Sequence, residues 1–474
     1  MSASVGATRS PAADLVAPLV ARARAAQAVA DGYDQARVDE LVAAAAWAIL
    51  EPGRNRLLSE LAVRDTGIGE VEDKVLKNHR KTLGLLRDLH GRRTVGVISE
   101  DASTGIVEIA RPVGVVCAVT PSTNPAATPA NKIINSLKAR NAVIVAPSPK
   151  GASTCARLIE FVHAELDRIG APRDLVQMLP APVTKEATAE LMRQCDLVVA
   201  TGSQANVRAA HASGTPAFGV GTGNVASIVD ETADLGAAAQ KIVESKAFDN
   251  ATSCSSENSV VLVEAIADRM LAALAGHGCV QVEGEDRARL EACMWNDGKL
   301  SPAVIGQSAA AIAQRAGLAD PAARSARILL VDESGAGPKH RFSGEKLSPV
   351  LTVYRARDFD DAKEIVRRVY AYQGAGHSVS LHSRIESRAL DLGLTLPVAR
   401  VILNQVHVVA NGGSFSNGLP VSLSMGCGTW GRNNFSENMN VRHYMNVTRV
   451  ALPIPERVPA LDELLGPYFE RWGK

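Results

Sequence analysis

The sequence predicts an α/β protein built from a doubly wound parallel sheet, a second α/β unit and a small β arm. Between Gly114 and Gly221, short runs of Val, Ile and Leu alternate with helical stretches, which is typical of a parallel sheet with both faces covered. Before this segment, apolar residues recur at helical spacing from about Ala12 to His90. At 474 residues, the chain is long enough for two or three packed domains.

The chain is expected to begin with helices and to continue into a hairpin. The stretches DLVAPLVARARAAQAVA and ARVDELVAAAAWAIL carry the helical repeat, with Arg, Asp and Glu between the apolar positions. The segment from Arg93 to Pro112 contains two β-branched runs around the polar turn SEDASTG, a hairpin pattern. Because an isolated hairpin is only marginally stable, we expect this one to pair with another strand.

Five strands are predicted for the first sheet, and a polar loop follows most of them. The loops read TPSTNP, APSPK, TGSQ and GVGTGN, and ligands of doubly wound sheets bind beyond such carboxyl ends. No complete G-x-G-x-x-G follows a strand, and GVGTGN alone is a weak phosphate signal. The predicted strands are Gly114–Thr120, Asn141–Pro147, Leu175–Pro180, Asp196–Gly202 and Pro216–Gly221.

A second α/β segment extends from about Ala233 to Asn411. It contains the strand-like runs RILLVDES, SPVLTVYRA, HSVSLHS and ARVILNQ. The tail that follows begins as a strand, NVTRVAL, and is expected to end as a Pro-rich surface passage.

Charge and hydropathy exclude several classes of partner. Lys and Arg number 51 and Asp and Glu 50, so a formal net charge of +1 provides no field for nucleic acid or an anionic membrane. The longest apolar run, Leu41–Leu50, is shorter than the roughly 20 residues that a spanning helix needs. The N-terminal MSASVGATRSPAADL lacks an apolar stretch behind a basic start. We therefore expect a cytoplasmic protein without a secretory signal that acts on small molecules.

Seven widely spaced cysteines include no C-x-x-C pair, and the chain has no H-E-x-x-H motif. Disulfide frameworks and metal sites are therefore not expected. Cys254 differs from the others because it lies in FDNATSCSSENS, among small hydroxyl and amide residues before an apolar run. By itself this stretch is compatible with a packed thiol or with a nucleophile.

The chain resembles the aldehyde dehydrogenase superfamily, and within it the coenzyme A-acylating branch that includes the aldehyde half of bifunctional aldehyde/alcohol dehydrogenases. Eight segments carry the resemblance in the family's order: VEDKVLKNH, RPVGVVCAVTPSTNP, SLKARNAVIVAPSPK, GVGTGNVASIVDETADL, SKAFDNATSCSSENSV, GEKLSPVLTVYRA, GAGHSVSLHS and LSMGCGTWGRNNFSEN. The resemblance implies an aldehyde dehydrogenase-like fold with three parts. These are a cofactor-binding domain over residues 1–232 with a hairpin arm at about 93–112, a catalytic domain over 233–411, and a C-terminal return and oligomerisation segment over 412–474.

The resemblance assigns catalytic roles to Cys254, Asn124 and His377. A thiolate at Cys254 can add to an aldehyde and later leave as part of a thioester. The Asn124 amide would hold the resulting oxyanion together with the backbone N–H of Cys254, although an Asn before Pro125 also shapes turns. His377 would assist the coenzyme A thiol or hold a cofactor phosphate, or it is a loop residue.

The resemblance also draws attention to a missing carboxylate. Water-using members of the family carry a general-base Glu at the head of ELGGK, and alignment through DETADL puts Gly219 at that position. Coenzyme A is already a good nucleophile, so a thioacyl enzyme can be resolved by thiol exchange without activated water. The missing Glu therefore favours a thioester product.

The cofactor implied by the resemblance is NADP or NAD. Glu345 in GEKLSPV would bind the nicotinamide ribose hydroxyls, and Gly202 and Ser203 open a helix whose free N–H groups favour an anion. Ser148 and Lys150 in APSPK would lie near the adenosine ribose, where they could accept a 2′-phosphate, so the choice between the two cofactors stays open. The remaining expected cofactor contacts are Thr120, Pro121, Ser122 and Gly221.

The substrate prediction depends on the segment NGGSFSNGLP, which looks more like acylating sulfoacetaldehyde dehydrogenases than like enzymes for acetaldehyde or succinate semialdehyde. Acetaldehyde, propionaldehyde and succinate semialdehyde stay open as alternative substrates. A sulfonate needs cationic or amide donors, for which Arg432, Asn411 and Asn417 are the candidates. A reductase of acyl phosphates and a non-catalytic structural member of the family remain as alternatives. The hairpin arm and NVTRVAL predict a homodimer or homotetramer, since pairing would cover exposed strand edges.

Overall fold

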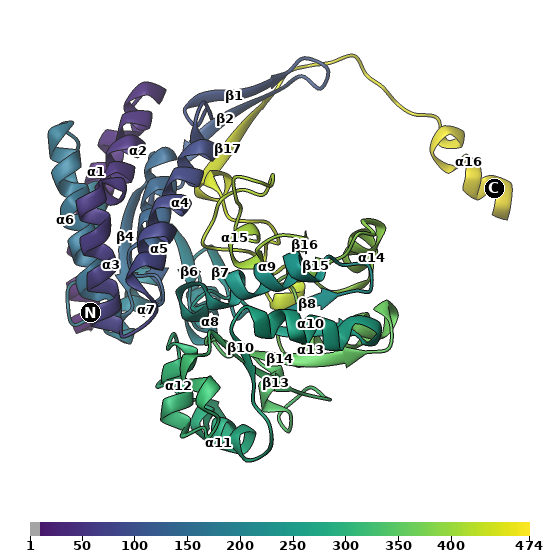
Figure 1. Cartoon of the computed structure of the whole chain (residues 1–474). Helices are drawn as coiled ribbons and strands as arrows, with labels where there is room; N and C mark the ends of the chain where they lie inside the picture. The colour runs from purple at the N-terminus through teal and green to yellow at the C-terminus, as the bar shows by residue number, and fades with distance from the viewer. Residues whose placement is uncertain (1–9) are drawn as a thin grey trace, which may run out of the picture.

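The computed structural model describes residues 10–474, so the N-terminal residues 1–9, where no secretory signal is expected, lie outside the described residues. Figure 1 shows a helical layer, two sheets and an arm. The predicted helical start is confirmed, because four helices precede the first strand. Ser10 and Asp34 cap the first two helices by accepting hydrogen bonds from Ala13 and Arg37 N–H. The four helices are α1 (Pro11–Asp31), α2 (Gln35–Leu50), α3 (Pro52–Thr66) and α4 (Val71–Leu89).

The first sheet confirms the doubly wound prediction. Its five strands are parallel in the order β5-β4-β3-β6-β7, so the chain winds outward from β3 to β5 and then crosses to β6 and β7. The loops after β3 and β6 diverge at this switch point, where such sheets bind ligands. The strands are β3 (Val115–Thr120), β4 (Ala142–Pro147), β5 (Val176–Met178), β6 (Leu197–Thr201) and β7 (Ala217–Val220), and the helices are α5 (Ala127–Lys138), α6 (Ala152–Arg168), α7 (Lys185–Gln194) and α8 (Gln204–Ala212).

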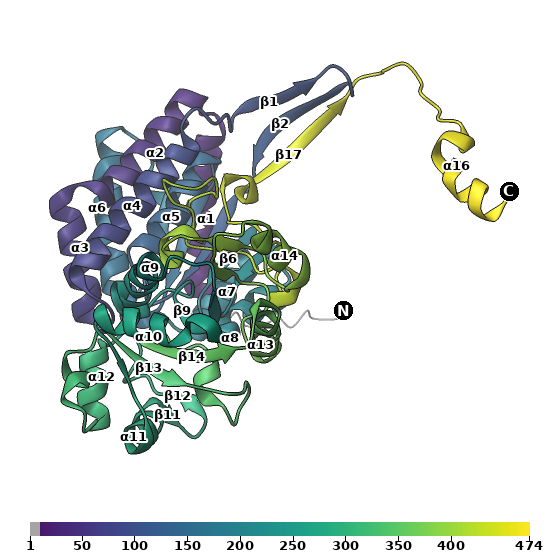
Figure 2. The same ribbon diagram turned by 45° about the vertical axis from the view of Figure 1, so that its right-hand side comes forward.

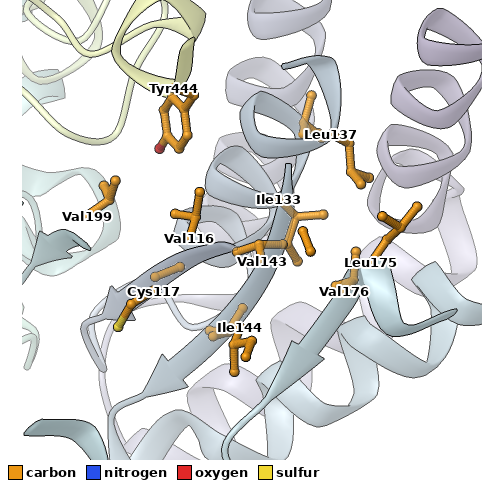
Figure 3. Close-up of a cluster of buried hydrophobic side chains, with 14 of the residues drawn as sticks. Val116, Cys117, Ile133, Leu137, Val143, Ile144, Leu175, Val176, Val199 and Tyr444 are labelled. Atoms are coloured by element: carbon orange, nitrogen blue, oxygen red, sulfur yellow. The ribbon is translucent and has the colours of Figure 1, made fainter. Parts of the chain in front are cut away.

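A fully buried apolar cluster fixes α5 on this sheet. Ile133 and Leu137 of α5 lie with Val116 and Val143 of the strands in one core, and all four side chains are buried (Figure 3). The same core contains Tyr444 from near the end of the chain. The loop that follows β3 is thereby held at a defined position by helix-on-sheet packing.

The second sheet is also parallel, with seven strands in the order β10-β13-β14-β9-β8-β15-β16. The chain changes sheets between Val220 and Val225, earlier than the boundary at 232/233 that we expected, because β8 pairs with β9 and β15. The strands are β8 (Val225–Val229), β9 (Glu257–Val263), β10 (Cys279–Gln281), β13 (Ile328–Asp332), β14 (Val350–Ala356), β15 (Val379–His382) and β16 (Val401–Leu403).

The second unit also contains helices and one small hairpin. A two-stranded antiparallel hairpin, β11 (Trp295–Asn296) with β12 (Lys299–Leu300), follows α11. The helices are α9 (Leu235–Ala247), α10 (Ala267–Gly276), α11 (Gly284–Met294), α12 (Ala309–Ala316), α13 (Phe359–Tyr372), α14 (Ser387–Thr395) and α15 (His407–Ala410).

The predicted hairpin finds its partner at the other end of the chain. Strands β1 (Gly96–Asp101) and β2 (Ile106–Pro112) are antiparallel, and β17 (Met445–Ala451) adds to β2 along its whole length. This three-stranded arm extends away from the body in both views (Figures 1 and 2). The expected surface passage is correct only to residue 460, because a helix, α16 (Leu461–Trp472), follows it.

The carboxyl ends of the strands in the first sheet face the amino ends of strands in the second sheet. Loops at the carboxyl ends of β3, β6 and β7 face segments that precede β9, β14 and β15 of the second sheet. Within residues 10–474, no helix combines the length and the apolar character that crossing a bilayer requires. The same part of the chain contains no group of three His, Cys, Asp or Glu side chains arranged to hold a metal ion.

We predict that Leu137→Ala lowers the free energy of unfolding by about 2–5 kcal/mol, because it leaves a cavity in a core that the rest of the helix cannot refill. Urea denaturation followed by circular dichroism measures the change. Leu76→Ala on α4 is the matched control, since Leu76 is 47% exposed and its truncation should cost less than about 1 kcal/mol. Equal shifts for the two variants would contradict the assigned core.

Candidate active site

A cavity of about 290 Å³ lies where the two sheets meet. Both units contribute to its walls, so neither sheet forms the site alone. The first unit supplies three loops, and the second supplies the turn around Cys254 together with Glu345 and Leu347. The lining residues are Pro121, Ser122, Thr123, Asn124, Thr128, Thr201, Gly202, Ser203, Val220, Gly221, Thr222, Thr252, Ser253, Cys254, Glu345, Leu347, Leu423 and Met425.

Cys254 lies in a turn between the short 3₁₀ helix Phe248–Ala251 and β9, with its side chain partly exposed to the cavity. Burial by the surrounding protein raises the pKa of this thiol to about 12, and the Glu345 carboxyl contributes in the same direction. The charge of the Arg400 guanidinium lowers the pKa of Cys254, but this effect is smaller than the rise that burial causes. The resting side chain is therefore a thiol, and it needs a base before it can act as a nucleophile.

His377 is a titratable side chain in hydrogen-bond contact with this thiol. Its Nε2 lies 3.3 Å from Cys254 Sγ, within the distance of a hydrogen bond to sulfur. Burial depresses the pKa of His377 well below its ordinary value, and the charges of Arg400 and His407 add to this effect. The imidazole is therefore neutral and can accept the thiol proton.

The backbone before Cys254 adopts a conformation that non-glycine residues rarely take. Asp249, Asn250 and Ala251 have φ values of 50°, 52° and 59°, which are three consecutive residues in the left-handed region. Each costs of order 1–3 kcal/mol and persists only where surrounding contacts enforce it. This turn directs the chain so that Cys254 enters the cavity.

The carboxylate of Asp249 supplies most of the enforcing contacts. It accepts hydrogen bonds from Glu70 N–H at 2.9 Å, from Thr252 Oγ1 at 2.7 Å and from the ammonium groups of Lys74 and Lys77. Asp249 and both lysines are buried. The two ammonium groups hold the pKa of this carboxyl below its ordinary value in spite of burial, and burial lowers the pKa of Lys74 to about 8.

Lys77 also fixes the orientation of Asn124. Its Nζ donates to Asn124 Oδ1 at 2.9 Å, so the Asn124 carbonyl is engaged and the Nδ2 donors remain for a ligand. Asn124 Nδ2 has one contact with protein, to Thr123 Oγ1 at 3.5 Å. The sequence analysis did not single out Lys77, although it lies within VEDKVLKNH, one of the segments that carry the family resemblance.

Glu345 faces the cavity and accepts a hydrogen bond from Gly223 N–H at 3.2 Å. Burial raises the pKa of its carboxyl to about 8. Gly223 is required here by close approach, because a Cβ on it would lie 2.1 Å from the carbonyl oxygen of Cys254. Among the described residues that line the cavity, Glu345 carries the only carboxylate.

Gly219 does not face the cavity as the alignment suggested. A Cβ built on Gly219 would point at Val207 and His211 of α8, whereas the next residue, Val220, lines the cavity. The residue that faces the site from the end of β7 is therefore Val220. Neither Gly219 nor Val220 carries a carboxylate, so the general-base Glu of water-using members of the family is missing at this position in either case.

Most of the predicted cofactor residues lie around one part of the cavity. Gly202 and Ser203 are at the N-terminus of α8, where Ser203 Oγ accepts from Asn206 N–H at 3.3 Å. Thr120 is buried behind the loop and its Oγ1 has no partner among the described residues. Of the predicted residues, those that line the cavity are Pro121, Ser122, Gly202, Ser203, Gly221 and Glu345.

Ser148 and Lys150 lie beside this group without lining the cavity. The backbone N–H of Ser148 donates to Thr120 O at 3.0 Å, which holds the end of β4 next to the end of β3. Lys150 is exposed at the start of the following helix. Free donors of this kind at the carboxyl edge suit an anionic or hydroxylated ligand.

The three residues expected to contact a sulfonate are not brought together. Asn411 is buried, donates from Nδ2 to Ser255 Oγ at 2.9 Å and leaves Oδ1 without a partner in the described chain. Asn417 donates to Gln405 Oε1 and Ala410 O, so its amide is used within its own loop. Arg432 is exposed, has a φ of 58° and does not line the cavity.

Arg400 is a buried cation that the sequence analysis missed, although it lies in ARVILNQ. Its guanidinium donates to the carbonyl oxygens of His377 at 3.0 Å, Gly426 at 2.8 Å and Ser436 at 3.1 Å. No carboxylate of residues 10–474 forms a salt bridge with it, and its charge acts on both Cys254 and His377. A single buried cation has no recognisable sequence pattern, so nothing in ARVILNQ indicates that Arg400 acts on Cys254 and His377.

We predict that Asp249→Asn destabilises the protein by about 3–5 kcal/mol, because it leaves the buried ammonium groups of Lys74 and Lys77 without a counter-charge. Urea denaturation at pH 7 measures this loss. Asp268→Asn is the control, since Asp268 is 87% exposed where it pairs with Arg355 and should contribute less than about 1 kcal/mol. A stability loss below about 1 kcal/mol for Asp249→Asn would refute the role of this carboxylate.

Known proteins share this fold and sequence over almost the whole chain. Residues 3–280 match the model of the aldehyde dehydrogenase family. The chain is 66% identical to the acylating sulfoacetaldehyde dehydrogenase of Cupriavidus necator, over 98% of this chain and 94% of that protein. It is 43% identical to the acylating sulfoacetaldehyde dehydrogenase of Bilophila wadsworthia, over 95% and 98% of the two chains. The crystal structure of an acetylating aldehyde dehydrogenase from Geobacillus thermoglucosidasius superimposes with a TM-score of 0.90 at 33% identity, covering 95% of this chain and 98% of that one. This chain therefore belongs to the aldehyde dehydrogenase family.

Proposed function

We propose that this protein is a coenzyme A-acylating aldehyde dehydrogenase that oxidises a short-chain aldehyde, best sulfoacetaldehyde, to its acyl-CoA thioester. The observation that carries the proposal is the Cys254–His377 pair at 3.3 Å, in a cavity whose only lining carboxylate is Glu345 among the described residues. Identity of 66% to an acylating sulfoacetaldehyde dehydrogenase supports both the reaction and the substrate.

The first step uses residues of this chain alone. His377 Nε2 accepts the Cys254 thiol proton while the sulfur adds to the aldehyde carbon. The oxygen of the resulting thiohemiacetal accepts hydrogen bonds from Asn124 Nδ2 and from the backbone N–H of Cys254. Because Lys77 engages Asn124 Oδ1, the amide donates to the oxyanion without reorganising.

The cofactor is NAD or NADP, which supplies a hydride acceptor when bound. The residues present fit such a group, because the Glu345 carboxyl and the N-terminus of α8 line the same cavity, and Thr120 Oγ1 at the end of β3 has no partner in the described chain. Glu345 would hold ribose hydroxyls, and Gly202, Ser203 and Gly221 would approach the phosphates. Ser148 and Lys150 lie where a 2′-phosphate would favour NADP.

Release as a thioester follows from the composition of the site. Water is a weak nucleophile that hydrolytic relatives activate with a carboxylate, and the described lining of the cavity has no second carboxylate besides Glu345. After His377 has released the first proton to solvent, it can accept the proton of the coenzyme A thiol as that sulfur attacks the thioacyl carbon. Cys254 then leaves as a thiolate and takes the proton back from His377, so the same imidazole serves both halves of the reaction.

For the sulfonate, we propose a revised set of contacts. The cationic groups that act on Cys254 are Arg400 and Lys81 of α4, whereas Arg432 is exposed. Burial lowers the pKa of Lys81 to about 7, so Lys81 is fully charged only below pH 7. Lys81 Nζ donates to Gly412 O at 2.9 Å and Gly413 O at 3.2 Å, so it lies against the NGGSFSNGLP segment and retains a third donor. Asn411 and Asn417 would shape this loop rather than bind the anion directly.

We also propose that the protein forms a homodimer or homotetramer in the cytoplasm. The arm has two unpaired strand edges, on β1 and on β17, within the described chain. A second copy that pairs with these edges would remove an aggregation hazard.

We predict acyl-CoA formation from sulfoacetaldehyde, coenzyme A and NAD or NADP, followed by mass spectrometry with acetaldehyde, propionaldehyde and succinate semialdehyde as competitors. Cys254→Ala should abolish turnover, and Asn124→Ala should lower kcat by about 10²–10³ because it removes one oxyanion donor. Cys293→Ala, a half-buried thiol outside the cavity, is the matched control and should retain activity.

Free acid formed equally fast without coenzyme A would refute the thioester product. Turnover that depends on inorganic phosphate instead of coenzyme A would favour the reductase of acyl phosphates. Failure of every aldehyde to protect Cys254 from alkylation in the presence of cofactor would favour the non-catalytic alternative.

Cofactor affinity should depend on pH through Glu345. Because burial raises the pKa of this carboxyl to about 8, it is protonated below pH 8 and gains its full acceptor capacity as the pH rises above 8. We predict that NAD or NADP binds more tightly at pH 9 than at pH 7, as measured by fluorescence titration. Glu345→Gln should bind more weakly and show no rise, and an identical pH dependence in that variant would exclude Glu345 as its source.

A further inference from the structure

Two buried side chains continue the hydrogen-bond chain behind His377, on the side away from Cys254. His377 Nδ1 lies 2.8 Å from Ser378 Oγ, and Ser378 Oγ lies 2.9 Å from His407 Nε2. Together with the 3.3 Å contact to Cys254 Sγ, these distances form one continuous path of four groups. The side chains of His377, Ser378 and His407 are all at least 99% buried.

The direction of each hydrogen bond follows from the one before it. The buried Cys254 thiol keeps its proton, so its S–H donates and His377 Nε2 accepts. A neutral imidazole then carries its proton on Nδ1, which donates to Ser378 Oγ. The Ser378 hydroxyl is left to donate to His407 Nε2, and the neutral His407 carries its own proton on Nδ1. In this arrangement the His377 lone pair faces the nucleophile.

The backbone holds this path in place. The carbonyl of His377 accepts from Arg400 Nη2 at 3.0 Å, and the carbonyl of Ser378 accepts from the Tyr370 hydroxyl at 2.6 Å. His407 begins α15, and the next residue, Val408, donates its N–H to Ser245 Oγ at 2.9 Å. Since both ends are fixed, the three side chains have little freedom to take another arrangement.

Packing alone does not explain why a histidine occupies position 407. Its Nδ1 has no hydrogen-bond partner among residues 10–474, although the residue is fully buried. A buried polar group without a partner destabilises the fold, and an apolar side chain of similar volume would avoid that cost. The need for a hydrogen-bond acceptor for the Ser378 hydroxyl, which His407 Nε2 supplies, explains why an imidazole is present.

We propose that Ser378 and His407 are positioning residues that hold His377 in the tautomer whose Nε2 lone pair accepts the Cys254 thiol proton. The inference deepens the proposed function and rests on it for the role of Cys254. In the step, the S–H bond breaks, an N–H bond forms at His377 Nε2, and the sulfur electron pair forms the bond to the aldehyde carbon. Ser378 keeps accepting from Nδ1–H, which stabilises the imidazolium that forms.

Other charged or titratable groups also face this pair and contribute to its pH response. They come from several elements, so variants of Ser378 and His407 must be compared with a background in which these groups are unchanged. The groups are Arg400, Glu345, Cys427 and Lys81, together with His382, which acts on His407.

The test measures the alkylation of Cys254 by iodoacetamide between pH 6 and 9, with peptide mass spectrometry to identify the labelled residue. Partners that orient a metal-bound imidazole are typically worth about 10–100-fold, and we expect an effect of the same order for His377. Ser378→Ala and His407→Leu should slow alkylation at pH 7 by about that factor and move the rate profile to higher pH. The same variants should lower kcat for acyl-CoA formation with KM changed less than about twofold.

Two further variants separate positioning from packing. Ser378→Thr keeps the hydroxyl and should restore most of the rate. His382→Leu is the matched control, because His382 is a buried imidazole of β15 whose Nε2 also lacks a partner in the described chain. His382→Leu should alkylate at the wild-type rate. The melting temperature of His407→Leu should not fall below that of the wild type.

Alkylation of Ser378→Ala and His407→Leu at the wild-type rate and with the wild-type pH profile would overturn the proposal. An equal loss in His382→Leu would also overturn it, because the effect would then be general to the core. Alkylation needs neither aldehyde nor coenzyme A. A wild-type protein that shows the predicted alkylation pattern but forms no acyl-CoA would therefore refute the proposed function and leave the positioning role standing.

Discussion

The site depends on one buried ionic interaction, the carboxylate of Asp249 between the ammonium groups of Lys74 and Lys77. This carboxylate enforces three left-handed residues before Cys254 and ties the turn to α4 of the first unit. Through Lys77 the same interaction reaches the Asn124 amide. A buried charge is costly unless it is paired and hydrogen-bonded, and here each member satisfies the others. The turn that carries Cys254 and the Asn124 amide are therefore held by the same interaction, although they belong to different units.

The second constraint is the way in which the sheets face each other. A parallel sheet collects its loops at the carboxyl edge, and the first sheet does so at the switch point between β3 and β6. The second sheet contributes from its opposite edge, because Cys254, Glu345 and His377 precede β9, β14 and β15. One cavity thus receives the N-terminus of α8 from one unit and Cys254 and Glu345 from the other, with His377 hydrogen-bonded to Cys254. Arg400 braces the second group by donating to the His377 carbonyl and to the loop at Gly426.

Much of the fold could be predicted from the sequence, because each prediction used a local pattern. The five strands of the first sheet, the N-terminal helices and the hairpin all match the structure. The errors occurred where the pattern is ambiguous. The buried strand β8 was not predicted and its residues were assigned to the first domain, and α16 was missed because prolines precede it and Pro467 lies inside it. The alignment placed Gly219 in the cavity, but the neighbouring residue Val220 is the one that faces it. A shift of one residue along a strand moves a side chain to the opposite face of the sheet.

The sequence alone determined the fold class and the family resemblance, which in turn singled out Cys254, Asn124 and His377 for the proposed roles, because residue types and periodicities are local properties. Only the tertiary structure decided which groups act on them. Cys254 meets His377 across a separation of 123 residues, and Lys77 meets Asp249 across 172. It also decided that Arg432 lies outside the cavity and that Arg400, Ser378 and His407 lie behind the nucleophile. Such contacts depend on how two sheets pack, and no short stretch of sequence contains that information.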